Sequence, residues 1–258
     1  MSEALLTHWS GEPVAVLREA WRVPLVEAYA RLGSTNDRAR ALAAEGCEPF
    51  TVVLAEEQTR GRGRGGAAWH SPARAGLWMS VVLRGDGSGP PLHLPLLVGL
   101  AAARAIEAAA AGLEVRLEWP NDLMVGGRKV GGVLCERAHY RVVVGVGINV
   151  QTPEGGFPQT LRARATSLEA VGGGRLSRNL LAGLVLKELR RLSDAHPTRL
   201  SAEALAELHA RDALADRPVV TAQEGRGTAR GLDPYGALLL ERPDGSRVRV
   251  VAGSARLA

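Results

Sequence analysis

The chain has 258 residues, enough for one large domain with a buried core and a second, smaller one. Hydrophobic residues make up 46% and charged residues 23%, as in a soluble globular protein, and the longest apolar stretch, residues 94–103, is about half a membrane span. The net charge of +5 is the balance of 32 basic and 27 acidic residues. Of the basic residues 30 are arginines and only two are lysines, Lys129 and Lys187, and they are scattered along the chain. Basicity alone is therefore weak evidence for nucleic-acid binding.

Cysteine and histidine usage argues against two further classes of site. Cys47 and Cys135 form neither a metal-spaced pair nor a disulfide framework, which favours a reducing environment. The six histidines lack the spacing of a zinc site, and the N-terminal residues lack the basic and apolar segments of a signal peptide. We therefore expect a cytoplasmic protein that binds neither zinc nor a membrane.

The first half of the chain alternates between helical and extended patterns. Residues 14–20 have helical character, and the alanine-rich run 37–44 predicts a helix with Ser34 or Thr35 as its N-cap. Further patterns predict a strand at 50–56, a strand at 77–83 and a helix at 96–111 that opens with Pro95.

Three more strands are expected at residues 114–119, 129–136 and 141–150. Gly126 and Gly127 provide a hairpin turn between the first two. Strands joined by tight turns, with helices inserted between them, indicate an α+β fold in which a mixed β-sheet is covered by helices on one face.

The C-terminal part of the chain has a different texture. Helices are expected at 176–192 and, capped by Ser201, at 201–213. Short β runs separated by turns then follow at 219–222, 227–232, 237–241 and 247–251, which is typical of a small barrel of about 40 residues. We place a domain boundary near residue 216, so that the domains are 1–215 and 216–258.

The segment GRGRGGAAWHSP, residues 61–72, is the most informative loop. Its glycines let backbone N–H groups approach a bound anion, and Arg62 and Arg64 match phosphate or carboxylate oxygens. Trp69 can cover a ligand and exclude water. The alternatives are a disordered RNA-binding Arg-Gly tail, a chance product of the arginine-rich composition and a plain surface turn. Strand patterns on both sides argue against the tail.

Four other segments have the wrong composition for a simple core. They are Ser34-Thr35-Asn36, Trp119-Pro120-Asn121-Asp122, Lys129 to Gly132 and Gly145 to Asn149. Each also has a purely structural explanation. The first segment can be a helix cap and the second an Asn-Asp turn. The third can be a hairpin with a solvated lysine and the fourth a tightly packed strand. The chain has only four asparagines, and three of them fall in these segments.

Further motifs accompany these segments. In chain order the set is STN at 34–36, Gln58 followed by GRGRGG…W at 61–69, WPNDL at 119–123, KVGG at 129–132, GVGIN at 145–149, ATSL at 165–168 and GTARGLDPYGALLL at 227–240. Together and in this order, the motifs resemble those of the biotin protein ligases. The resemblance implies a catalytic domain like that of class II aminoacyl-tRNA synthetases, residues 1–215, and an SH3-like barrel, residues 216–258.

The resemblance also implies the reaction of a biotin–[biotin carboxyl-carrier protein] ligase. The carboxylate of biotin attacks the α-phosphate of Mg·ATP to give biotinyl-5′-AMP and pyrophosphate, and a lysine of a biotin carboxyl carrier protein then takes up the biotinyl group. Lys129 would lie between the biotin carboxylate and the α-phosphate. Asp122 would be the carboxylate linked to Mg²⁺.

The implied site residues fall into three overlapping groups. The implied catalytic residues are Lys129, Arg62, Arg64 and Asp122. The implied biotin-binding residues are Ser34, Thr35, Asn36, Gln58, Gly61, Arg62, Lys129, Gly131 and Gly147. The implied ATP-binding residues are Arg62, Gly63, Arg64, Trp69, Asn121, Asp122, Lys129 and Asn149.

The chain departs from the family pattern at two positions. The family loop usually reads GRGRxGRxW, and here Ala67 replaces the third arginine. The lysine that usually precedes WPND is replaced by Glu118, which reverses a local charge. Both changes concern nucleotide affinity more than the reaction class.

Partners and rival functions follow from the same comparison. About thirty residues precede STN without the pattern of a recognition helix, so we expect no DNA binding and no operon repression, and the family favours a homodimer. A lipoate or octanoate ligase shares the catalytic fold but lacks the GRGRGG loop and this C-terminal domain. A nucleic-acid-binding protein using the Arg-Gly loop would bind in a salt-sensitive manner without ATP.

Overall fold

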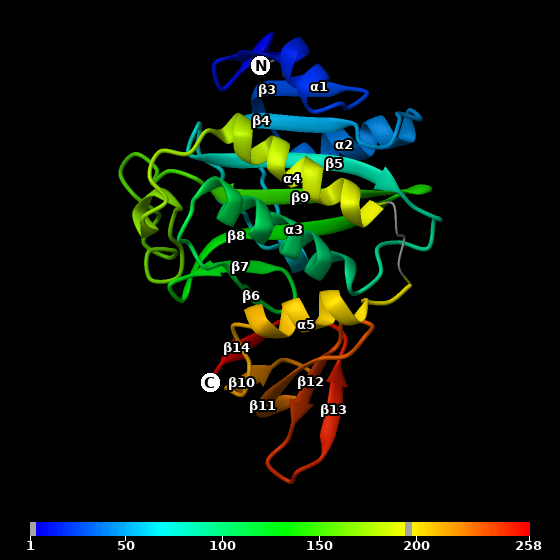
Figure 1. The fold of residues 1–258 in the computed structure, drawn as a ribbon, viewed down its shortest axis with the longest axis vertical. Coiled ribbons are helices and arrows are strands. Elements are labelled where there is room, and N and C mark those ends of the chain that lie inside the picture. The colour runs from blue at the N-terminus through cyan, green and yellow to red at the C-terminus, as the bar shows by residue number, and fades with distance from the viewer. Residues whose placement is uncertain (1–3, 194–197) are drawn as a thin grey trace.

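Seven strands form a mixed sheet in the large domain, in the order β3-β4-β5-β9-β8-β7-β6 (Figure 1). The computed structural model describes residues 4–193 and 198–258. β3 and β4 are parallel, and the other neighbouring pairs are antiparallel, which confirms the expected mixed sheet. The strands are β3 (Val26–Leu32), β4 (Val52–Gln58), β5 (Gly76–Arg84), β6 (Arg116–Glu118), β7 (Asp122–Val125), β8 (Arg128–Ala138) and β9 (Arg141–Asn149).

Helices pack on both faces of this sheet. The long helices α3 (Leu94–Ala109) and α4 (Arg178–Ser193) share one face, where they form the main core with Leu54 of β4. The shorter α2 (Thr35–Ala44) packs on the opposite face against Val53. The sequence predicted helices on one face of the sheet. This holds for α3 and α4, whereas α2 covers the opposite face.

α3 lies beside α4 on this face, and it is apolar around most of its circumference because it contacts the sheet, α4 and α5. Its buried residues are Leu96, Leu97, Val98, Gly99, Leu100, Ala101, Ala102, Ala103, Ala105 and Ile106. Pro95 stands in the first turn, where its missing N–H costs no intrahelical bond. The helix begins at Leu94, two residues before the expected start at residue 96.

The C-terminal β domain, residues 218–257, is a five-stranded antiparallel sheet in the order β13-β12-β11-β10-β14. Its strands are β10 (Pro218–Thr221), β11 (Gly225–Leu232), β12 (Leu238–Glu241), β13 (Arg247–Val250) and β14 (Ala255–Leu257). α5 (Ala202–Arg211) precedes it and begins as expected at Ser201, whose Oγ accepts a hydrogen bond from the N–H of Ala204.

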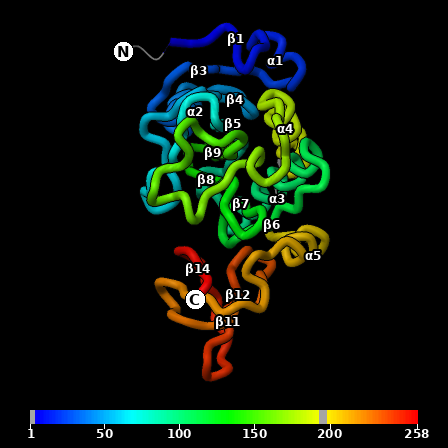
Figure 2. The backbone as a smooth tube through the Cα atoms, turned by 90° about the vertical axis from the view of Figure 1, so that its left-hand side faces the viewer, coloured from blue at the N-terminus to red at the C-terminus, as the bar shows by residue number. Residues whose placement is uncertain are grey.

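This β domain lies against the β6 edge of the large sheet, with α5 alongside (Figures 1 and 2). The indole N–H of Trp119, just after β6, donates to the carbonyl of Gly236 at 3.0 Å. The guanidinium of Arg64 donates to the carbonyl of Gly253 at 3.0 Å. The segment before β14 therefore touches the glycine-rich loop of the large domain.

Several elements were not expected from the sequence: β3, β7, β14 and the short pair β1 (His8–Trp9) and β2 (Glu12–Pro13). The helix expected at 14–20 is present as α1 (Val14–Ala20). Within the described parts of the chain, no helix combines the length and apolar character needed to span a membrane.

The segment before β3 is anchored by aromatic and ionic contacts. Trp9 is fully buried and packs edge-to-face on Trp21, with ring centroids 6.3 Å apart. Arg178 of α4 lies 5.0 Å from the Trp9 ring centroid and pairs with Glu56 of β4 at 2.7 Å. The side chains of this ion pair are only 11% and 13% exposed, so each charge depends on the other for its compensation.

Arg178→Ala is expected to lower the free energy of unfolding by about 3–5 kcal/mol, because Glu56 would remain as an unpaired, nearly buried charge. Arg31→Ala is a matched control, because it breaks the ion pair between Arg31 and Glu57, the residue that follows Glu56 in β4. The side chains of Arg31 and Glu57 are 54% and 33% exposed. That exposed pair should contribute less than about 1 kcal/mol. Chemical denaturation followed by circular dichroism measures both, and equal losses would contradict the dependence on burial.

Candidate functional site

Glycines clear the face of the sheet next to α2. Alternate residues of β9 enter the main core, whereas Gly145 and Gly147 face the other side. A Cβ at Gly145 would lie 2.3 Å from Oδ1 of Asn36, and a Cβ at Gly147 would lie 2.6 Å from Nε1 of Trp69. Glycine at these two positions therefore lets Asn36 and Trp69 approach the strand backbone directly.

Residues 61–69, which we call the GRGR loop, fold over this cleared face. The N–H of Gly63 donates to the carbonyl of Ala67 at 2.7 Å, and the N–H of Trp69 donates to the carbonyl of Gly61 at 2.9 Å. The two consecutive glycines at the turn have φ angles of 61° and 78°, which favour glycine. A loop hydrogen-bonded across its own base differs from a disordered RNA-binding tail.

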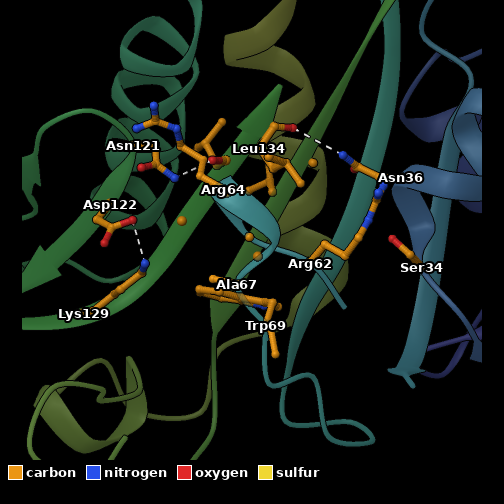
Figure 3. Close-up of a pocket in the computed structure, with 18 of the residues that line it drawn as sticks. Ser34, Asn36, Arg62, Arg64, Ala67, Trp69, Asn121, Asp122, Lys129 and Leu134 are labelled. Carbon is orange, nitrogen blue, oxygen red and sulfur yellow. Dashed lines mark hydrogen bonds and ion pairs between the residues drawn. The ribbon is translucent and has the colours of Figure 1, made fainter. Parts of the chain in front are cut away.

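A cavity of about 430 Å³, the first cavity, lies between the GRGR loop and the sheet (Figure 3). The structure brings most of the sequence-predicted site residues to its wall. These are Ser34, Thr35, Asn36, Gln58, Arg62, Gly63, Arg64, Trp69, Asn121, Asp122, Lys129 and Gly147.

Three predicted residues do not line the first cavity. A Cβ at Gly61 would lie 2.6 Å from the carbonyl oxygen of Trp69, and a Cβ at Gly131 would lie 2.8 Å from the side chain of Leu123. Both glycines therefore face protein, and Gly132 takes the place expected for Gly131. The third, Asn149, lines a different cavity and donates from Nδ2 to the carbonyl of Thr166 at 3.0 Å.

One end of the first cavity is rich in small polar groups. The N–H of Thr35 donates to Oε1 of Gln58 at 2.9 Å. Oγ of Ser80, a residue that the sequence analysis did not select, lies 2.6 Å from Oδ1 of Asn36 and 2.7 Å from Oγ1 of Thr35. Ser34 is the N-cap residue of α2, but its side chain makes no capping hydrogen bond. Its hydroxyl is therefore available to a ligand in the cavity.

Two carboxylates absent from the sequence-predicted site hold Arg62 at this end. Nη2 of Arg62 donates to Oδ1 of Asp37 at 2.7 Å and to Oε2 of Glu136 at 2.9 Å. Nδ2 of Asn36 also donates to Oε2 of Glu136, at 2.8 Å. Glu136 therefore ties the GRGR loop to α2. Its spacing of four residues from Gly132 places both on one face of β8, and this period of two was the available sequence signal.

Lys129 and Asp122 mark the opposite end of the cavity, beside Asn121 and Arg64 (Figure 3). Nζ of Lys129 lies 2.6 Å from Oδ1 of Asp122 and 5.2 Å from the ring centroid of Trp69. Nδ2 of Asn121 donates to the carbonyl of Val133, which fixes the turn before β7 on β8. Lys129 thus lines the cavity and is paired with Asp122, which differs from the solvated hairpin lysine of the structural alternative.

A second cavity of about 600 Å³ lies between the β6 edge and the C-terminal β domain. It adjoins the first cavity, because the two share a stretch of wall that we call the junction. The junction residues are Ala67, Ala68, Trp69, Asn121, Asp122, Lys129, Ser254 and Arg256.

Glu118, the charge reversal noted in the sequence, lies in the wall of the second cavity. Burial raises the pKa of its carboxyl group, and the negative charge of Asp122 acts in the same direction. The positive charges of Arg164, Lys129 and Arg256 oppose this rise. Glu118 therefore shares its surroundings with cations from both domains.

Comparisons with known proteins agree with the two-part organisation. The model for the Biotin/lipoate A/B protein ligase family matches residues 29–152, and the model for the Biotin protein ligase C terminal domain matches residues 219–257. The chain is 36% identical over 245 residues to the Biotin--[acetyl-CoA-carboxylase] ligase of Mycobacterium tuberculosis, covering 90% of this chain and 88% of that protein.

Two further likenesses cover most of the chain. It is 35% identical over 233 residues to the Bifunctional ligase/repressor BirA of Bacillus subtilis, covering 83% of this chain and 68% of that protein. Among solved structures, a biotin protein ligase from Aquifex aeolicus in complex with biotin and ATP superposes with a TM-score of 0.80 and 28% identity, covering 91% of this chain and 99% of that one.

Proposed function

The chain belongs to the Biotin/lipoate A/B protein ligase family, and on that premise we propose that it is a biotin protein ligase. It activates biotin with ATP as biotinyl-5′-AMP and transfers the biotinyl group to a lysine of a carrier protein. The observation that carries this proposal is the junction, where Lys129 borders both a polar-ended cavity and a second cavity large enough for a nucleotide.

Biotin fits the first cavity with its ureido group at the polar end. Ser34, Thr35 and Gln58 supply the donors and acceptors that a ureido group needs. The valeryl chain then points its carboxylate toward Lys129 at the opposite end of the cavity. Arg62 already has two carboxylate partners, so we assign it to closure of the GRGR loop over biotin and leave charge neutralisation to Lys129.

The nucleotide fits the second cavity, with its phosphates at the junction. Trp69, Asn121 and Asp122 border both cavities, and Asn149 lines the far side. Biotin and ATP would then meet at Lys129.

The first chemical step joins two anions. A carboxylate oxygen of biotin forms a bond to the α-phosphorus. The bond from the α-phosphorus to the pyrophosphate oxygen breaks, and pyrophosphate leaves with the electron pair of that bond. Two unit charges 4 Å apart repel by about 4 kcal/mol at an effective dielectric of 20. The ammonium group of Lys129 lowers this barrier, and Trp69 and Asp122 hold it in place.

Mg²⁺ is the expected companion of ATP. Across the described residues, no group of three or more His, Cys, Asp or Glu side chains is arranged to hold a metal ion. Mg²⁺ needs only one or two carboxylates when phosphates and water supply its other ligands, so Asp122 alone fits such a role. The ion would then add positive charge beside the phosphates.

The second step transfers the biotinyl group. The carrier lysine nitrogen attacks the anhydride carbonyl carbon, the bond to the AMP oxygen breaks, and the lysine nitrogen loses a proton. A free lysine has a pKa of about 10.4 and is almost wholly protonated at neutral pH. Asp122 borders both cavities and is our candidate to accept that proton.

Four finer proposals concern partners and setting. The acceptor is a biotin carboxyl carrier protein of acetyl-CoA carboxylase or a similar biotin-dependent carboxylase, a proposal supported by the names of the relatives. The chain functions as a cytoplasmic homodimer and does not repress an operon. Analytical ultracentrifugation and an operator-binding assay test the last two points.

The deciding experiment is exchange of labelled pyrophosphate into ATP. We expect exchange that depends on biotin and does not respond to lipoate or octanoate, followed by biotinylation of a carrier domain at one lysine. The match to the biotin ligase C-terminal domain favours biotin over lipoate. Exchange driven by lipoate, or salt-sensitive nucleic-acid binding without ATP use, would transfer the assignment to one of the rivals.

Glu136→Gln is expected to raise the dissociation constant for biotin by at least about tenfold, because charge-assisted hydrogen bonds contribute about 1.5–3 kcal/mol. The variant weakens the bonds that hold Asn36 and Arg62 at the polar end. Isothermal titration calorimetry measures the effect, and Glu57→Gln, which alters an exposed ion pair on β4, serves as the control. Unchanged biotin affinity in Glu136→Gln would remove Glu136 from the site.

A further inference from the structure

Two positive side chains border both cavities at the junction: Lys129 and Arg256. Lys129 comes from β8 of the large domain, and Arg256 comes from β14, the edge strand of the C-terminal β domain. Each domain therefore contributes one cation to the wall where, on the proposed function, the phosphates of ATP pass.

The strand geometry directs Arg256 away from the interior of its own domain. Its neighbour Ala255 is buried inside the β domain, and successive side chains of a strand point to opposite sides. Arg256 pairs with Val220 of β10 through the backbone, so its position is set by the sheet. The guanidinium group is thus presented to the junction by a fixed strand.

The positive charge of Arg256 is less fully compensated by protein groups than that of Lys129. Lys129 pairs with Asp122 at 2.6 Å, whereas Arg256 forms no ion pair with any residue that the structure describes. Arg256 and Glu118 line the second cavity together, and the positive charge of Arg256 opposes the rise in the pKa of Glu118. A ligand with several negative charges would find this cation available.

Among the residues that the two cavities share, Lys129 and Arg256 are the positive side chains. Ala67 of the GRGR loop borders both cavities but carries none, and Glu118 adds a negative charge to the second cavity. Arg256 lies in the same junction as Ala67. A cation on the C-terminal β domain can therefore serve where the loop supplies no third arginine.

We propose that Arg256 is a nucleotide-binding residue that contacts the polyphosphate of ATP at the junction and makes the C-terminal β domain part of the ATP site. This inference rests on the proposed function. It adds that one charge needed for ATP binding lies on β14 and compensates for Ala67.

The test is biotin-dependent exchange of pyrophosphate into ATP, which requires no carrier protein. Arg256→Ala is expected to raise the KM for ATP by at least about tenfold, because a charge-assisted contact to phosphate is lost. The KM for biotin should stay within about twofold, since the polar end of the first cavity is untouched. Arg256→Lys should recover part of the ATP affinity, because it keeps the charge but loses the planar fork.

Arg226→Ala is the matched control. Arg226 and Arg256 are the cross-strand neighbours of Val220 on its two sides, but Arg226 lines neither cavity. Its loss should leave both KM values unchanged. An equal rise in the KM for ATP in Arg226→Ala would attribute the effect to the general charge of the β domain and overturn the proposal.

A second pair of variants tests the compensation directly. Ala67→Arg in the Arg256→Ala background should restore most of the ATP affinity, because both positions border the junction. Glu118→Gln in the unmodified protein should lower the KM for ATP, because it removes a negative charge from the second cavity. Failure of both changes to act in these directions would contradict the compensation.

Other outcomes distinguish a failure of the Arg256 proposal from a failure of the proposed function. If Arg256→Ala keeps its KM for ATP but loses affinity for the carrier protein, Arg256 is a carrier contact and the proposal is wrong. If the unmodified chain shows no biotin-dependent exchange, the proposed function itself fails. Normal exchange in the unmodified chain with an unchanged KM for ATP in Arg256→Ala rejects only the role of Arg256.

Discussion

Lys129→Ala is expected to reduce biotin-dependent exchange of pyrophosphate into ATP by at least about a hundredfold, the loss typical of removing a preorganised donor from a charge-developing site. Lys129 is the ammonium group at the junction, and its neighbours Asp122 and Trp69 fix it there. Because the reaction brings a carboxylate to a phosphate, the rate of the chemical step should fall more than the affinity for biotin. Rapid-quench measurement of biotinyl-5′-AMP formation separates the two.

Lys187→Ala is the natural control, since Lys187 is the only other lysine of the chain and lies exposed on α4. A second variant addresses the carboxylate that Lys129→Ala leaves without its partner. In Lys129→Ala with Asp122→Asn, the unpaired charge is gone but the ammonium group is still missing. We expect no recovery. Recovery of exchange in the double variant would show that Asp122 inhibits when unpaired and that Lys129 is not required for the chemistry.

Most residues selected from the sequence come together around one cavity, whereas several strands of the sheet were not expected. Glycines, asparagines and the lysine of the motifs were selected because their residue types are unusual in a core, and most of them line the first cavity. Their convergence has a physical basis: Gly147 must be glycine for Trp69 to lie on β9, and such a restriction is visible in the residue type. Gly132 faces the cavity and Gly131 faces Leu123, and the glycine pair in the sequence does not reveal which member does which.

β3 was missed because both of its faces are covered. Val26 faces the main core, whereas Glu27 lies on the side of α2 and is only 9% exposed. Burial raises the pKa of Glu27, but hydrogen bonds from Arg38 and Tyr29 outweigh it and lower the pKa. In the sequence, a charged residue such as Glu27 suggests a loop and not a buried strand. The ion-pair partner that allows its burial, Arg38, lies on another element, α2.

The role of Arg62 was obscured for a similar reason. The sequence places it among the cations that neutralise the reacting anions, but its guanidinium pairs with Asp37 and Glu136. Glu136 is 74 residues away along the chain, so no local pattern connects the two. Motif composition therefore predicts which residues gather at a site, whereas the distribution of charge among them depends on long-range pairing.

Gly147→Ala is expected to weaken both biotin and ATP binding by at least about tenfold, because a displaced wall of a preorganised site costs more than 1 kcal/mol. The added Cβ would lie 2.6 Å from Nε1 of Trp69, which borders both cavities and supports Lys129. The indole must then move off the strand. Because Trp69 lies on the GRGR loop and not in the main core, the melting temperature should change little. Calorimetry for biotin and the KM for ATP in the exchange assay measure the two losses.

Gly132→Ala separates a steric cause from a general effect of side chains on this face of the sheet. Its Cβ would lie 3.4 Å from Cε of Lys129, an ordinary contact distance, so its losses should be much smaller than those of Gly147→Ala. A double-mutant cycle with Trp69→Ala then isolates the clash. If Gly147→Ala acts by expelling the indole, it should have almost no further effect once the indole is absent. Additive losses in the double variant would mean that residue 147 contacts the ligand itself, and the close approach of Trp69 would not be the reason for glycine at this position.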